Sequence, residues 1–299
     1  LQAQGRNLRI LVGFAAGGAA DTVARAVGDG LREAGYLAIV ENKAGASGRL
    51  ASEALLAAPA DGNTLLLTPV GNLTLAPHVL PGLRYQPEQF AGVGSACSMS
   101  FALAVGGGSP ARSLREFLDL ARGNPAMAAF GTPGAGTAMH FMGVMLGKAA
   151  KVPLAHVAYK GGSAAVTDAI GGTLPAVITT LPNLLPLHRS GKLRILAVSD
   201  ARPNPALPDV PTFQSLGFGD LTVSESFAFF ARAGTPQPTV ASLNMAINAA
   251  VALPRIMDIL QKAEYQPQAM SAEALDRKVR AEYASWARVV KASGYQPQD

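Results

Sequence analysis

The stretch LRILVGFAAGGAADTVARAV, Leu8 to Val27, decides the fold class. Its first seven residues form a short apolar run, and a glycine-rich break follows. Beyond the break, Val23, Ala26 and Val27 recur at the spacing of an amphipathic helix. The stretch therefore predicts a strand, a glycine-rich loop and a helix, in that order.

The same order repeats along the chain, because apolar runs of strand length alternate with helical patterns as far as residue 199. Strands that alternate with helices indicate an α/β protein with parallel sheets covered on both faces. The expected strands lie near residue 39 and at 64–68, 101–105, 127–130, 154–159, 176–179 and 193–199. The expected helices lie at 48–58, 72–79, 113–122, 136–149, 163–170 and 184–190.

The chain has 299 residues and too many strands for one compact sheet, which predicts two domains. Residues 201–213 carry four prolines and are expected to form an extended connection. A strand at 226–231 and two long helices at 238–263 and 272–292 follow, with no further strand expected. The simplest arrangement has the chain leave the first domain near Ser98 and return near Thr222. Domain 1 is then 1–98 with 222–299, domain 2 is 99–221, and the two crossings form a hinge.

Composition excludes several classes of protein. No apolar run reaches the roughly 18 residues that a membrane span needs, and no low-complexity tract is present, so a globular protein is expected. The net charge of +5 is spread thinly without a basic stripe, which disfavours a nucleic-acid binder. The single cysteine, Cys97, excludes an internal disulfide. We interpret the N-terminus LQAQGRN as a mature end after removal of a signal peptide, with an arbitrary boundary as the alternative.

Two glycine-rich loops are the candidate binding elements: GFAAGGAAD, Gly13 to Asp21, and GTPGAGTAMH, Gly131 to His140. Each follows an expected strand and opens a helix, which is where open α/β sheets bind ligands. Glycines let the backbone approach a ligand, and a helix start offers unpaired N–H groups with a partial positive charge. The pattern therefore suits a carboxylate or a phosphate.

The polar side chains of these loops have two interpretations each. Asp21 and Thr137 are candidates both for helix N-caps and for ligand contacts. We expect at least one of the hydroxyls of Thr132 and Thr137 to bond an anion directly. His140 is either a buried structural residue of its helix or a ligand contact.

Other chemistries lack their motifs. The loops match neither GxGxxG, nor the phosphate-binding loop of nucleotide hydrolases, nor the GxSxG of hydrolases. The remaining histidines, His78, His156 and His188, are isolated, so no metal site is expected. The sequence predicts capture of an anion without chemistry, with no cofactor and no catalytic residue.

Several segments carry a family resemblance, of which ENKAGASG, GKLRILAVSD and ALPDVPTF are the most specific. Together with GFAAGGAAD, FGTPGAGTAMHFMG, YKGGSAAVTDAIGG and FFARAGTPQP they resemble, in order, the Bug family of periplasmic solute receptors. These receptors serve uptake systems of the tripartite tricarboxylate type. The resemblance covers nearly the whole chain.

The resemblance implies a type II periplasmic-binding-protein fold, in which two α/β domains, each a mainly parallel sheet flanked by helices, close on a small carboxylic acid. The loops that grip the carboxylate, largely through main-chain donors, correspond here to Phe14–Asp21 and Gly131–His140. The implied ligand-binding residues are Phe14, Ala15, Ala16, Gly17, Gly18, Ala19, Asp21, Thr132, Gly134, Ala135, Gly136, Thr137 and His140. Thr68, Asn72, Lys160 and Thr179, at other strand ends, are added as candidates that line the cleft; Lys160 is as readily a solvated surface charge.

The chain departs from the family pattern at the proposed site. It has Ala15 and Ala16 where the family usually has prolines, and Ala19 and Ala20 where proline and threonine are common. Thr179 stands where many members carry aspartate, which disfavours an amino-acid ligand.

The expected function is a periplasmic receptor that captures a small carboxylic acid in an interdomain cleft and delivers it to membrane permease subunits. The acid is a dicarboxylate, an amino acid or a related acid, and the receptor is expected to be a monomer without enzymatic activity or nucleic-acid partners. The alternatives are a ligand-sensing domain for a signalling partner and an enzyme that processes small acids with His140.

Overall fold

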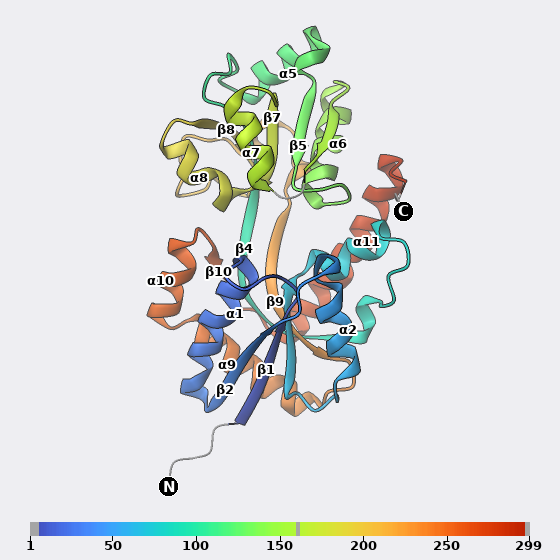
Figure 1. The fold of residues 1–299 in the computed structure, drawn as a ribbon, viewed down its shortest axis with the longest axis vertical. Helices are drawn as coiled ribbons and strands as arrows, with labels where there is room; N and C mark the ends of the chain where they lie inside the picture. The colour runs from blue at the N-terminus through green and yellow to red at the C-terminus, as the bar shows by residue number, and fades with distance from the viewer. Residues whose placement is uncertain (1–5, 160–161, 297–299) are drawn as a thin grey trace. The chain divides into compact units, whose positions relative to one another are not determined.

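The chain forms two compact units, which are described separately (Figure 1). The computed structural model describes residues 6–159 and 162–296. Of the described residues, the first unit comprises 6–98 and Glu225–Arg288; the second comprises 99–159, 162–224 and 289–296. These units differ from the expected domains at residues 222–224 and 289–296, which fall in the second unit. The reason at the C-terminus is packing that sequence patterns do not reveal, since the Lys148 ammonium donates to the Ala292 carbonyl.

The sheet of the first unit combines parallel and antiparallel strands. β1 (Arg6–Val12) pairs in parallel with β2 (Tyr36–Asn42) and with β3 (Thr64–Pro69). β3 pairs antiparallel with β9 (Ser224–Arg232). A short strand that the sequence analysis missed, β10 (Gln266–Pro267), pairs antiparallel with β4 (Phe90–Gly106) at Cys97 and Ser98. β1, β2 and β3 thus form the parallel part of this sheet, and β9 and β10 add antiparallel pairs to it.

Helices cover both faces of this sheet (Figure 1). α1 (Ala19–Gly30) contacts α9 (Gln237–Val251) and α10 (Pro254–Lys262) on one side. α2 (Arg49–Ala57) and α11 (Ala272–Ser293) share a buried cluster with strand residues Leu11, Leu66 and Phe230 on the other. These burials explain the helical periodicity that the sequence displays.

Prolines divide two helices that the sequence analysis expected to be continuous. The helix expected at 238–263 is α9 and α10, which are bent by 69° at a break that ends in Pro254. The helix expected at 72–79 is α3 (Gly71–Thr74) and α4 (Ala76–Val79), with Pro77 in the first turn of α4. Proline has no N–H to donate to the preceding turn, so it is favoured at a helix start over a helix interior.

The second unit has the same strand, loop and helix order. β5 (Ala129–Thr132) pairs in parallel with β6 (Ala155–Ala158) and β7 (Ala176–Thr180). The later part of β4 pairs antiparallel with β7 and with β8 (Leu193–Val198). The helices are α5 (Leu114–Gly123), α6 (Ala138–Ala150), α7 (Gly162–Gly171) and α8 (Leu181–Arg189). This sheet is also mixed, because β4 runs against its neighbours.

The proline-rich connection contains no helix or strand, as expected, but it forms successive turns rather than an extended chain, and it belongs to the core of this unit. Thr212 forms an isolated parallel bridge with Val198. Leu207 and Val210 pack with α7 and α8 against β7 and β8. Short 3-10 turns complete the chain at Leu31–Ala34, Ala46–Gly48, Pro87–Gln89, Pro125–Met127, Gln214–Leu216 and Gly219–Leu221.

Within the ranges that the structure describes, no single helix is long and apolar enough to span a membrane. Only the bent pair α9 and α10 reaches such a length and composition together.

The contact between α6 and β5 makes one glycine indispensable. A Cβ atom added at Gly143 would lie 2.1 Å from the ring of Phe130, which is fully buried. We expect Gly143→Ala to lower the free energy of unfolding by about 1–3 kcal/mol, since overpacking outweighs the gain in helix propensity. Gly123→Ala, at the end of α5 in open space, is the matched control and should change it by less than about 0.5 kcal/mol. Urea unfolding measures both, and equal midpoints would contradict the packing argument.

Candidate functional site

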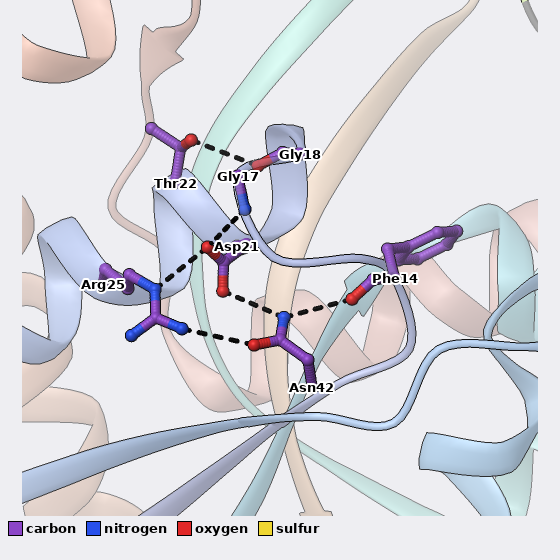
Figure 2. Close-up of polar contacts among 7 residues, drawn as sticks. All are labelled: Phe14, Gly17, Gly18, Asp21, Thr22, Arg25 and Asn42. Atoms are coloured by element: carbon purple, nitrogen blue, oxygen red, sulfur yellow. Dashed lines mark hydrogen bonds and ion pairs between the residues drawn. The ribbon is translucent and has the colours of Figure 1, made fainter.

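The first glycine loop, between β1 and α1, is held in shape by a buried carboxylate (Figure 2). Asp21 is only 3% exposed. Its oxygens accept hydrogen bonds from the Gly17 N–H at 2.8 Å, Arg25 Nε at 2.9 Å and Asn42 Nδ2 at 2.9 Å. Asp21 therefore organises the loop that it follows.

Asn42 ties this network to the neighbouring strand. Its Nδ2 also donates to the Phe14 carbonyl at 3.0 Å, and its Oδ1 accepts from Arg25 Nη2 at 3.2 Å (Figure 2). The hydrogen bond from Arg25 lowers the pKa of Asp21 to about 2, against a smaller opposing effect of burial. The carboxylate is thus charged at neutral pH, and its charge is matched by the guanidinium.

The start of α1 has no side-chain cap. Its N-cap is Gly18, so the interpretation of Asp21 as N-cap is wrong: Asp21 lies in the first turn and accepts from Gly17. The N–H groups of Ala19 and Ala20 meet no acceptor among the described residues. Ala15, Ala16 and Ala19 are exposed, and Gly17 adopts a φ of +80° that favours glycine. The loop thus presents backbone rather than polar side chains.

Two further loops of the first unit meet this one. Thr68, at the end of β3, is buried, and its Oγ1 accepts from Asn72 Nδ2 at 3.1 Å. The same Nδ2 donates to the Ser47 carbonyl at 3.1 Å. A Cβ at Gly48 would lie 2.7 Å from Asn72 Nδ2 and 3.2 Å from the Phe14 ring. The structure therefore brings Phe14, Thr68 and Asn72 to the same end of the sheet.

Gly13 and Gly48 meet backbone against backbone. A Cβ at Gly13 would lie 2.4 Å from the Cα of Gly48. Side chains are excluded from this contact, which brings the loop after β1 directly against the loop after β2.

The second glycine loop, between β5 and α6, is held by hydroxyls. Thr137 is the N-cap of α6, as one interpretation expected: its Oγ1 accepts from the His140 N–H at 3.3 Å. That hydroxyl donates to the Gly134 carbonyl at 2.9 Å. The buried Thr132 hydroxyl also lies 3.0 Å from that carbonyl and 3.3 Å from the Gly134 N–H. Both hydroxyls thus bond within the loop, and neither is left over for an anion in this conformation.

His140 also supports the loop. Its Nδ1 accepts from the Gly136 N–H at 3.1 Å, and its ring stacks on His156 with centroids 3.8 Å apart. Burial lowers the pKa of His140; burial, and secondarily His140, lower the pKa of His156 to about 4. Both imidazoles are therefore neutral at pH 7.

The sequence analysis treated His156 as isolated. Strand pairing places it opposite Phe130, two residues before Thr132 on β5. Because its distance along the chain gives no hint of that register, no sequence signal could have identified it.

The exposed part of this loop is backbone, as in the first. Ala135 is exposed, and Gly136 has a φ of +73°. The N–H groups of Ala138 and Met139, in the first turn of α6, meet no acceptor in the part of the chain that the structure describes.

Thr179 lies beside this loop without facing solvent. It is fully buried on β7, and its Oγ1 accepts from Asn183 Nδ2 at 3.4 Å. A Cβ at Gly162 would lie 2.8 Å from that Oγ1 and 3.6 Å from Pro133. Lys160, the remaining candidate, lies outside the described residues.

The two loops share one design on separate units. In each, polar side chains bond within the loop, and the helix start offers main-chain N–H donors with the positive end of the helix dipole. Such a start binds carboxylate or phosphate oxygens. Within 6–159 and 162–296, no group of three or more His, Cys, Asp or Glu side chains is placed to hold a metal ion.

Residues 23–295 match the family model described as tripartite tricarboxylate transporter family receptor. The solved structure of Rpa4515 from R. palustris with adipate is 28% identical and covers 98% of this chain and 99% of its own, with a TM-score of 0.85. MatC (Rpa3494) from Rhodopseudomonas palustris with bound malate is 27% identical, with coverages of 95% and 99% and a TM-score of 0.80. The periplasmic binding protein BugD is 29% identical, with coverages of 98% and 99% and a TM-score of 0.82. These likenesses confirm the periplasmic-binding-protein fold.

The Asp21 network predicts a defined response to acid. Because its pKa is lowered from 3.8 to about 2, Asp21 stabilises the folded state above pH 4, and this stabilisation is lost as the pH falls toward 2. Asp21→Asn should lower the free energy of unfolding at pH 7 by about 1–2 kcal/mol, a range that allows for screening at the half-exposed Arg25. Urea unfolding at pH 7 and pH 2.5 should show the gap between variant and native protein narrowing in acid.

Asp29→Asn is the control on the same helix. Asp29 forms only exposed ion pairs with Arg32 and Arg255, at 3.4 and 3.5 Å, so its loss should matter little. An equal effect of the two substitutions would refute the role of Asp21 in the loop.

Proposed function

The chain belongs to the family of tripartite tricarboxylate transporter receptors, and from this premise we propose that it is a periplasmic receptor for a small carboxylate. It binds the acid through both glycine loops and delivers it to the permease subunits of an uptake system. It acts as a monomer and performs no chemistry on its ligand.

One observation carries the proposal: each unit ends a parallel strand in a loop whose side-chain donors bond within the loop and whose helix start has unpaired N–H groups. A carboxylate has several lone pairs and accepts such donors without a partner cation. The ligand contacts in this proposal are therefore main-chain atoms of residues 14–19 and 134–139. Asp21, Thr132, Thr137 and His140 shape the loops, and Thr68, Asn72 and Thr179 flank them.

A dicarboxylate is the favoured ligand class. The related Rpa4515 and MatC are described with adipate and malate, which are both dicarboxylates. Thr179 is buried and bonds to Asn183, so it supplies no negative charge to an amino group of the ligand. A dicarboxylate carries two carboxylate groups, and each of the two glycine loops of this protein suits a carboxylate group.

Transport in this proposal depends on a shift of population. A ligand held by loops of both units favours the arrangement in which both loops contact it. The shift in population can be no larger than the ratio of the ligand's affinities for this arrangement and for the others. The permease recognises that arrangement and receives the acid from it.

The enzymatic alternative relies on His140 and Asp21, and both side chains already accept hydrogen bonds within their own loops. His140 Nδ1 accepts from Gly136, and the Asp21 oxygens accept from Gly17, Arg25 and Asn42. Each of these groups is used to hold its own loop, which supports binding without turnover.

A thermal-shift screen tests the proposal. The protein is unfolded and refolded to remove carried-over ligand, then heated with malate, succinate, adipate, single amino acids and ATP. Dicarboxylates should raise the melting temperature, because a ligand that binds only the folded state at 100 times its Kd adds about 2.7 kcal/mol of stability. No rise with any acid, or a rise with ATP alone, would overturn the proposal.

Ala138→Pro tests the main-chain donors directly. Ala138 is the first residue of α6, where proline fits the helix, and the preceding Thr137 has the extended conformation that proline requires, with ψ 160°. The variant loses one N–H, so we expect about 10- to 100-fold weaker binding of the acid found in the screen, with the fold retained.

The matched control is Ala272→Pro, at the first position of α11, a helix that follows neither glycine loop. Calorimetric titration measures the affinities, and circular dichroism follows the fold. Undiminished affinity in a folded Ala138→Pro protein would show that the start of α6 does not hold the ligand.

A further inference from the structure

A pair of stacked imidazoles lies under the second glycine loop. The rings of His140, on α6, and His156, on β6, are nearly parallel, with an interplanar angle of 15° and centroids 3.8 Å apart. Both are half-buried, and Phe130, Phe141 and Tyr295 surround them with aromatic rings at centroid distances of 5.2 to 5.7 Å. Such packing suits two neutral rings and opposes two charged ones.

The hydrogen bond to the loop defines which nitrogen of His140 carries its proton. The Gly136 N–H donates to Nδ1 at 3.1 Å, so Nδ1 must be unprotonated and a neutral His140 carries its hydrogen on Nε2. Protonation at Nδ1 would set two N–H groups against each other. Gly136 is buried and has the positive φ on which the turn into α6 depends, so this bond holds the loop where the chain enters the helix.

His156 holds the other end of the loop through Thr132. Its Nε2 lies 2.7 Å from Thr132 Oγ1, which also lies 3.0 Å from the Gly134 carbonyl. A carbonyl can only accept, so the arrangement that gives each close pair a hydrogen has the threonine donating to Gly134 and His156 Nε2–H donating to the threonine. The two histidines therefore support the loop at Gly134 and at Gly136.

We propose that His140 and His156 are positioning residues that keep the loop 132–137 in its carboxylate-binding form, and that protonation of His140 at Nδ1 releases the loop, so that affinity falls in acid. This inference rests on the proposed function, since it names the regulation of the same site. Neither ring needs to touch the ligand.

The surroundings of the pair support the sign of the effect. Burial lowers the pKa of both histidines, and His140 lowers the pKa of His156 further. The described titratable groups on the elements packed against α6 include Asp220 on the 3-10 turn Gly219–Leu221 and Tyr159 after β6. The end of α11 adds Arg288 and Lys291, Tyr295 lies beyond it, and α6 itself carries Lys148. Only burial and the histidines themselves account for the lowered pKa values. An unconstrained histidine has a pKa near 6.5, so protons favour states in which the loop is released as the pH falls from about 6.5 toward 4.

A bound anion acting alone would have the opposite effect. A carboxylate near His140 favours the protonated ring by Coulomb attraction, and affinity would then rise in acid. The direction of the pH dependence thus separates a positioning pair from a cationic contact.

The experiment uses two variants that keep the hydrogen bonds and cannot take up a proton. In His140→Asn the amide Oδ1 occupies the place of Nδ1, and in His156→Gln the amide group occupies the place of Nε2. His188→Asn is the matched control, because His188 Nδ1 accepts from the Ile195 N–H at 3.2 Å elsewhere in the same unit. Calorimetric titration with malate and adipate gives, for each protein, the ratio of the affinity at pH 7.5 to the affinity at pH 5.0. Protonation of the ligand itself changes this ratio equally in all the proteins, so differences between them come from the protein.

The native protein and His188→Asn should lose about tenfold more affinity between the two pH values than His140→Asn does, since one pKa unit corresponds to tenfold. His156→Gln keeps a donor to Thr132 and leaves His140 free to titrate, so it should lose affinity much as the native protein does. Parallel losses in all four proteins, or a gain of affinity in acid that disappears in His140→Asn, would overturn the inference.

A ligand-free readout separates this inference from the proposed function. In NMR spectra of the free protein, the Gly136 amide resonance should move with the midpoint of the imidazole titration, and it should stay in place in His140→Asn. If neither malate nor adipate binds at any pH, the proposed function fails, whereas the Gly136 resonance still decides whether the pair controls the loop. A Gly136 resonance that is indifferent to the titration refutes the inference even when the acids bind.

Discussion

Backbone N–H groups at the start of a helix have no partner within the helix, and the architecture of this protein depends on leaving them unpaired at two places. An N-cap side chain or an acidic group bonded to the first turn would occupy them. At α1 the N-cap is a glycine, and the nearby Asp21 bonds backward to Gly17 instead. At α6 the cap from Thr137 takes only the His140 N–H and leaves those of Ala138 and Met139 open. The local sequence thus gives the loops rigidity without closing their donors.

The two loops reach the same end by different electrostatics. The first is held by a charged pair, Asp21 and Arg25, whose carboxylate stays ionised down to about pH 2. The second is held by hydroxyls and by two imidazoles, and the bond from Gly136 to His140 requires an unprotonated ring nitrogen. The first loop therefore keeps its charges in mild acid. The second loop is supported by histidines, which can take up a proton in mild acid. The protein thus holds one loop with a pair of constant charge and the other with groups whose charge depends on pH.

Hydrophobic periodicity predicted most of the elements because it reports burial, and burial is what the sheets and helices of both units share. It failed where structure depends on pairing over long distances. The two-residue strand β10 and the early part of β4 have no pattern of their own, since their partner is remote in sequence. Proline chemistry favours a break before Pro254, whereas helical periodicity alone predicts one continuous helix there.

The same distinction between local patterns and long-range pairing applies to the candidate site. The glycine loops were predictable because glycine, strand and helix start are adjacent in the chain. Their supports were not: Asn42 and His156 reach the loops from neighbouring strands, through registers that no local spacing encodes. The ambiguity of Asp21 and Thr137 was real at the level of residue type, because both residues are good caps, and only the hydrogen-bond geometry separates their roles.

The contact of Gly13 with Gly48 has a consequence for how this protein can change. Since the two backbones touch with no side chain between them, neither loop can be lengthened by a residue without displacing the other. Insertions in the loop after β1 and in the loop after β2 are therefore coupled. Tolerance to loop-length variation, which is common on protein surfaces, should be lowest at this point.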